Sequence, residues 1–141
     1  MFDVVVVGAD NSLTARRAVD AATELAHLSG GTLHIVSTYG PRSYFDDTRK
    51  DEFQRINTEG DVDALLPVLS FIAKKREVEA VLHAVKDAAA DVLVQKAAEL
   101  NADLVVVGNW GMHGVRRVLG SVPNSVAHSA HYSVAIIDTT E

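Results

Sequence analysis

The chain has 141 residues, of which 48% are hydrophobic, and a formal net charge of −6 at pH 7. This charge argues against a protein that binds nucleic acid or an anionic membrane, because a protein needs a basic surface to bind either of these polyanions. The absence of cysteine excludes disulfides and thiol chemistry, and the N-terminus lacks the basic region and long apolar core of a signal peptide. We expect a cytoplasmic protein, folded as one domain over residues 1–141, with neither nucleic-acid nor membrane partners.

Short apolar runs alternate with amphipathic runs along the chain, which is typical of strands alternating with helices. The predicted strands cover residues 4–7, 32–38, 78–85, 104–107 and 133–138. The predicted helices cover residues 13–28, 63–77, 89–100 and 122–129. We expect Ser12 to cap the first helix, and Gly30 with Gly31 to end it.

The region between the second strand and the second helix has no regular pattern. Residues 39–60 combine a proline, paired acidic residues and mixed charges, which predicts a long connection that is either a lid or disordered. Pro67, near the start of the next predicted helix, fits the first turn, where its missing N–H costs little. The basic triplet Lys74, Lys75 and Arg76 is favourable at the C-terminal end of that helix, and we interpret it as a solvated helix end.

The alternation of strands and helices predicts an α/β fold with a parallel sheet and right-handed crossovers. Ligands of such sheets bind beyond the carboxyl ends of the strands, where the strand order reverses. Two predicted strand ends carry unusual residues: Gly8, Ala9 and Asp10 follow the first strand, and residues 108–111 follow the fourth. If these ends are neighbours, they form one crevice in which Asp10 can accept hydrogen bonds from ribose hydroxyls.

The stretch from the fourth strand onward has the composition of a phosphate site. Its glycine-rich loop contains Gly108, Gly111 and Gly114, and Gly120 with Ser121 then opens another helix. Glycines let a ligand approach the backbone, and the free N–H groups at a helix start attract anions. The Walker pattern and the dinucleotide pattern GxGxxG are both absent, so neither of those nucleotide folds is indicated.

The sequence offers little for catalysis or for a metal centre. None of the six histidines has metal-ligand spacing; His128 and His131 lie three apart without a third ligand nearby, which indicates surface or packing roles. No Ser-His-Asp order, carboxylate pair or nucleophile elbow is present. We therefore predict no catalytic residue and no metal ligand.

Four segments together resemble the universal stress protein family, in its small single-domain bacterial form. They are VVVVGADNS near the N-terminus, ADLVVVGNWG, GSVPNSVAHSA and the closing SVAIID. The resemblance extends over almost the whole chain. Nucleotide-binding members of that family carry the pattern G-x2-G-x9-G-[S/T]; here eight residues, 112–119, separate Gly111 from Gly120 and Ser121. The loop is thus one residue shorter than the pattern.

The resemblance implies a Rossmann-like, doubly wound sheet of five parallel strands in the order 3-2-1-4-5, with helices on both faces. It also implies an adenine-nucleotide ligand, with ATP the leading candidate and AMP or cyclic AMP the alternatives; Mg²⁺ would accompany ATP. The last strand, from Ser133 to Asp138, would form a homodimer. The implied ligand-binding residues are Ala9, Asp10, Ser37, Gly108, Gly111, Gly120, Ser121 and Val122. His113 joins these candidates because it lies inside the glycine-rich loop.

The chain also departs from the family pattern at two further places. Asn11 stands where a glycine is common, and residues 86–89 replace a frequent glycine and proline and add the carboxylate of Asp87. The leading hypothesis is a dimeric nucleotide-binding sensor or regulator of a stress response. The shortened loop and Asp87 keep open a rival, an interaction module of the same fold that binds no nucleotide, and slow ATP hydrolysis is a third alternative.

Overall fold

A computed structural model describes residues 2–9, 15–39, 59–86, 89–109, 126–127 and 131–138. The strands are β1 (Val4–Gly8), β2 (Thr32–Tyr39), β3 (Ala80–Lys86), β4 (Leu104–Gly108) and β5 (Ser133–Ile137). All neighbouring pairs are parallel, and the order across the sheet is β3-β2-β1-β4-β5. The predicted α/β class, strand number and strand order are therefore confirmed.

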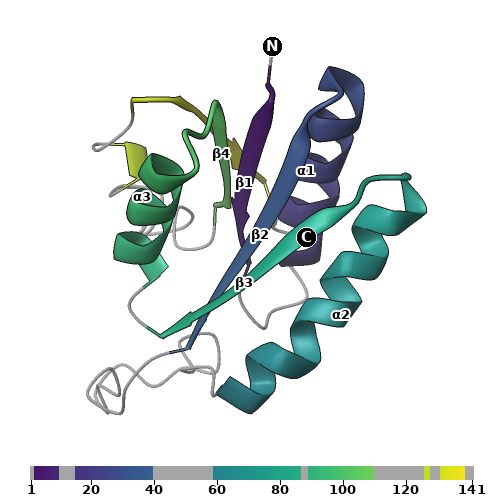
Figure 1. Cartoon of the computed structure of the whole chain (residues 1–141), viewed down its shortest axis with the longest axis vertical. Helices are drawn as coiled ribbons and strands as arrows, with labels where there is room; N and C mark the ends of the chain where they lie inside the picture. The colour runs from purple at the N-terminus through teal and green to yellow at the C-terminus, as the bar shows by residue number, and fades with distance from the viewer. Residues whose placement is uncertain are drawn as a thin grey trace.

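The sheet separates two apolar layers (Figure 1). Helices α1 (Ala15–Ser29) and α2 (Glu59–Lys75) pack on one face, against alternate strand residues such as Val5 and Ile35. Helix α3 (Ala89–Glu99) packs on the other face, against the intervening residues such as Val6 and Val36. Because both faces of the central strands are covered, β1 and β4 are continuous apolar runs, VVVV and LVVV, rather than alternating ones.

Helices α1, α2 and α3 all end in the same way. In each, the residue after the last turn takes a left-handed conformation, with φ of 67° at Gly30, 61° at Glu77 and 53° at Asn101. The following N–H groups then bond back to carbonyls of the last turn; at α1, Gly31 donates to Ala26 at 2.9 Å and Gly30 to His27 at 3.2 Å. This is the Schellman arrangement, which satisfies carbonyls that a helix end leaves free. The predicted end of the first helix at Gly30 and Gly31 is confirmed.

Glu77 is the unfavourable member of this set, because a side chain with a Cβ is strained at positive φ. We expect Glu77→Gly to raise the free energy of unfolding by about 1 kcal/mol. Asn101→Gly is the matched control and should change it by less, since asparagine tolerates this conformation. Urea denaturation of both variants measures the difference, and an unchanged or lowered midpoint for Glu77→Gly would contradict the expectation.

The start of α2 differs from the prediction. The helix begins at Glu59, four residues before the expected position, so Pro67 lies inside the helix rather than in its first turn. Pro67 is exposed, and its ring therefore points away from the sheet while Leu66 and Leu69 on the inner side are buried. The burial of this apolar face outweighs the hydrogen bond that a proline removes from a helix.

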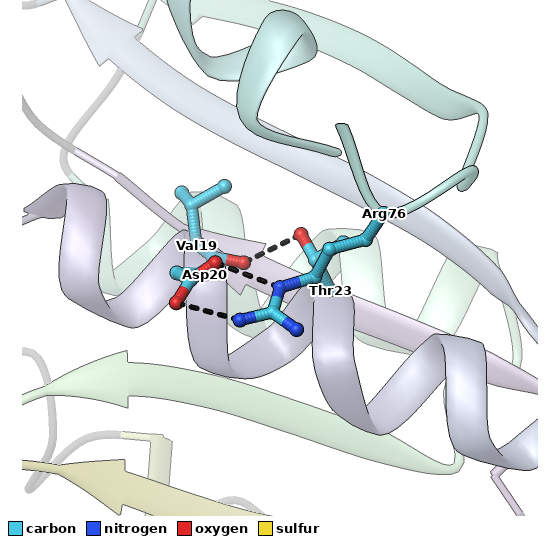
Figure 2. A network of polar contacts seen from close by, with 4 residues as sticks. All are labelled: Val19, Asp20, Thr23 and Arg76. Carbon is cyan, nitrogen blue, oxygen red and sulfur yellow. Dashed lines mark hydrogen bonds and ion pairs between the residues drawn. The ribbon is translucent and has the colours of Figure 1, made fainter. Parts of the chain in front are cut away.

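Arg76, just after the end of α2, forms an ion pair with a side chain of α1. Its Nε donates to Asp20 Oδ1 at 2.9 Å and its Nη2 to Asp20 Oδ2 at 3.2 Å, which ties the end of α2 to α1 (Figure 2). The bond to Asp20 raises the pKa of Arg76. Lys75 lies over the ring of Phe71. Lys74 and Lys75 are exposed and Arg76 is partly exposed, as expected for a solvated helix end; the pairing of Arg76 with Asp20 is a contact that the sequence does not reveal.

The carboxylate of Asp103 stabilises the end of the sheet at which the strands begin. Asp103 Oδ2, just before β4, accepts the backbone N–H groups of Asp3 at 3.0 Å and Val4 at 2.9 Å. The carbonyl of Asp3 accepts the N–H of Thr32 at 2.9 Å. The starts of β1, β2 and β4 are thus held in register by bonds that converge on Asp3.

Candidate functional site

The strand order reverses between β1 and β4. From β1 the chain continues outward through β2 to β3, and it then crosses to β4 on the other side of β1. The register pairs Val7 with Val106, so the ends of these two strands, at Gly8 and Gly108, lie at the same edge. The sequence predicted a shared crevice only if the ends of these two strands are neighbours. The structure confirms that β1 and β4 are neighbours.

The backbone leaves β1 in a fixed orientation at Ala9. Its N–H donates to the carbonyl of Val36 at 3.0 Å, and its carbonyl accepts the hydroxyl of Ser37 at 2.7 Å. Ser37 is fully buried and Ala9 nearly so. A buried hydroxyl with a short bond to a carbonyl has little freedom to move, so β2 fixes the backbone at Ala9, directly after β1.

Gly8 has a packing role. A Cβ at this position would lie 2.6 Å from Leu93 Cδ1 of α3, which is closer than atoms can pack. Leu93 is buried in the layer between α3 and the sheet. The glycine therefore allows α3 to lie directly against the carboxyl end of β1.

Asn109 holds the start of the glycine-rich loop to the end of β5. Its N–H donates to the carbonyl of Ile137 at 2.9 Å, and its Nδ2 donates to Asp138 Oδ1 at 3.1 Å. Sequence reasoning assigned no function to either side chain. The signal that could have found them is the presence of a polar residue directly after each of two adjacent strands, since parallel strand ends meet at one edge.

Ala9, Ser37 and Gly108 are the predicted site residues that the structure describes, and each lies at or next to the carboxyl edge of the sheet. Asp10, Gly111, His113, Gly120, Ser121 and Val122 lie outside the described residues, as do Ser12 and Asp87. The end of the last predicted helix does so as well, although Val126 and Ala127 are helical. The predicted contacts of these residues with a ligand remain predictions.

The described part of this edge offers backbone groups, one buried hydroxyl and one amide–carboxylate pair. The Ser37 hydroxyl is already bonded to the Ala9 carbonyl, so the exposed polar groups here are those of Asn109 and Asp138. In the described ranges, no group of three or more histidine, aspartate or glutamate side chains could hold a metal ion. Nor is any helix in those ranges long and apolar enough to cross a membrane.

Comparison with known proteins gives a consistent result along the whole chain. The sequence profile of the Universal stress protein family matches residues 1–138. Universal stress protein Rv1636 of Mycobacterium tuberculosis (strain ATCC 25618 / H37Rv) is 36% identical, and the alignment covers 99% of this chain and 98% of the relative.

Solved structures agree with the sequence comparison. A universal stress protein crystallised in complex with cAMP is 33% identical, with a TM-score of 0.78 and coverage of 99% of this chain and 98% of the other. A universal stress protein from Archaeoglobus fulgidus, solved with dAMP, is 23% identical with a TM-score of 0.70, and it covers 98% of both chains; it supports the fold alone. From the profile match and the near full-length identity, this chain belongs to the universal stress protein family.

Proposed function

We propose that this protein binds an adenine nucleotide in the crevice between the ends of β1 and β4, and acts as a dimeric sensor or regulator. The observation that carries the proposal is the position of Ala9 beside the reversal point. The N–H of Ala9 is bonded to the carbonyl of Val36 and the carbonyl of Ala9 to the hydroxyl of Ser37, so β2 holds the backbone on both sides of this residue. A rigid backbone edge at a reversal point is where α/β sheets bind nucleotides.

A nucleotide with one phosphate is the preferred ligand. The loop between Gly111 and Gly120 is one residue shorter than the family pattern, which leaves less backbone to surround a triphosphate. The 33%-identical relative was solved with cAMP, a nucleotide with a single phosphate. We therefore place cyclic AMP and AMP before ATP, with Mg²⁺ needed only for ATP.

The residue roles follow the order of groups in the ligand. Ala9 and the backbone near Ser37 would contact adenine, and Asp10 would accept hydrogen bonds from ribose hydroxyls. Gly108, Gly111 and His113 would line the ribose and phosphate. Gly120, Ser121 and Val122 would bind the phosphate through backbone N–H groups and the serine hydroxyl.

Dimerisation through β5 is the second part of the proposal. β5 lies at an edge of the sheet, and its four apolar residues from Val134 to Ile137 are only half-buried in the single chain. An apolar edge strand invites pairing with another chain. Light scattering coupled to size exclusion should give twice the 15.1 kDa mass of the chain; a monomer at high micromolar concentration would remove this part.

Ligand binding is tested with untagged protein. Nucleotide released on denaturation is identified by chromatography, and cyclic AMP, AMP, ATP and GMP are then titrated by calorimetry with Trp110 fluorescence as a second signal. We expect saturable binding of adenine nucleotides, no binding of GMP, and strong weakening by Gly120→Val or Asp10→Ala with the dimer retained.

No released nucleotide and no binding at millimolar ligand would favour the interaction module. Phosphate release that Gly120→Val abolishes would indicate an ATPase.

A further inference from the structure

A pair of histidines joins the edge strand β3 to its neighbour β2. His34 Nδ1 and His83 Nε2 lie 3.0 Å apart, and the ring centroids are 5.2 Å apart with 30° between the ring planes. Since the centroids are farther apart than the nitrogens by about one ring width, the two nitrogens face each other. The contact is an N–H···N hydrogen bond in which one ring donates and the other accepts.

The pair lies on the face of the sheet that α3 covers. His34 alternates in β2 with Leu33 and Ile35, which belong to the opposite layer, and the register places His34 beside Val81 and His83 beside Val36. Both rings are only partly exposed. On this face Val81 of β3 is exposed and Val85 packs against the layer under α3, so the histidine bond adds a polar side-chain link to that packing and to the backbone pairing of β2 with β3.

The hydrogen bond depends on how many protons the two rings carry. With no extra proton, one N–H···N bond forms; with one, the bond becomes charge-assisted and stronger. With two, both facing nitrogens carry hydrogen, so neither can accept and two positive charges face each other at about 3 Å. The pair therefore titrates in two separate steps, of which the second is disfavoured.

The charged neighbours come from α3. Burial is the largest cause for each ring and lowers the pKa of both histidines. The neighbouring His34 and then Lys96 also lower the pKa of His83, Glu99 raises it, and Lys96 lowers the pKa of His34. Lys96 and Glu99 also pair with each other at 3.4 Å, so their charges partly cancel. The net direction of the pKa is downward for both histidines, which adds to the opposition of the facing geometry to the second proton.

We infer that His34 and His83 form a proton-operated latch, which strengthens the pairing of β3 with β2 while the pair carries at most one proton and weakens it when both rings are protonated. The sign follows from linkage. Because the folded pKa values lie below the unfolded value of 6.5, the unfolded or opened chain binds more protons. The latch therefore keeps its stability while the pair carries no proton or one proton, and loses it as the pH falls below about 6.5 and through the second protonation step. This inference is independent of nucleotide binding.

Hydrogen exchange at the β3 amides tests the latch in the nucleotide-free protein. Between about pH 7.5 and 5.5, above the range in which ordinary carboxylates titrate, protection of residues 81–85 should fall roughly tenfold more than protection of β1, after correction for intrinsic exchange. His83→Gln and His34→Gln keep a hydrogen-bonding side chain but cannot place two charges together, so either should abolish the extra loss. His27→Gln, which changes an exposed histidine on α1, should leave it intact.

Imidazole NMR titration of the unmodified protein gives a readout that does not depend on how the variants fold. We expect two separated steps that are shared by His34 and His83. Independent titration of the two rings near pH 6.5, or equal changes in protection at β3 and β1, would overturn the latch. So would a pH response in both glutamine variants that matches that of the unmodified protein.

Discussion

Gly31→Ala should lower the free energy of unfolding by about 3 kcal/mol, although Gly31 does not have a positive φ. A Cβ at this position would lie 2.2 Å from the carbonyl oxygen of Phe2 and 3.0 Å from that of Asp3. These are backbone atoms, which cannot turn aside as the end of a side chain can. The neighbouring bonds of Asp3 to Thr32 and Asp103 resist the shift that would relieve the clash.

Gly30→Ala is the matched control for this prediction. Gly30 has φ of 67° and no atom within 4 Å of its would-be Cβ, so the substitution costs only the backbone strain of about 1 kcal/mol. Urea unfolding of the two variants should therefore rank the glycine with the ordinary backbone as the more sensitive one. Equal losses, or a larger loss at Gly30, would show that β1 can move away from the loop.

Ser37→Ala should lower stability by about 1–3 kcal/mol, because it leaves the Ala9 carbonyl without its hydroxyl donor in a buried place. If Ala9 lies in the nucleotide site as proposed, the variant should also weaken cyclic AMP binding roughly tenfold, equivalent to about 1.4 kcal/mol. The physical reason is that the backbone leaving β1 loses one of its two bonds to β2 and must be ordered by the ligand instead. Urea unfolding and calorimetric titration of the same sample measure both effects.

Thr23→Ala separates the effect on the site from the effect on stability. Thr23 is the other fully buried polar side chain among the described residues, and its hydroxyl donates to the Val19 carbonyl at 2.7 Å within α1 (Figure 2). It should lose about 1–2 kcal/mol of stability with unchanged nucleotide affinity. Equal weakening of binding in both variants would trace the effect to general loosening of the fold rather than to Ala9.

The strand and helix assignments come largely from local chemistry, which is why the sequence predicted them well. Valine-rich runs such as 104–107 are suited to a strand buried on both faces, and Gly30 adopts the left-handed conformation expected at a helix end. The order of the five strands came from the family resemblance, because periodicity alone does not say which strands are neighbours. The start of α2 was placed too late because Pro67 was assigned to the first turn, whereas burial of the inner face keeps the helix intact around it.

The sequence indicated where a ligand is expected, at the ends of β1 and β4, but not the hydrogen bonds found there. The glycines and Asp10 are conspicuous in the sequence because such residues meet ligands at strand ends. The hydroxyl of Ser37 and the amide of Asn109 are not conspicuous, because their partners, the Ala9 carbonyl and Asp138, lie 28 and 29 residues away. Hydrogen bonds of that kind depend on register, which only the assembled sheet determines.

The sequence by itself determined the class of fold, the family and the edge of the sheet where a ligand is expected, because these depend on local patterns and on motifs. Only the tertiary structure decided which distant polar groups meet. Arg76, at the solvated end of α2, is joined to Asp20 of α1. His34 and His83 are 49 residues apart and have no recognisable spacing, yet parallel pairing of β2 with β3 brings their nitrogens to 3.0 Å.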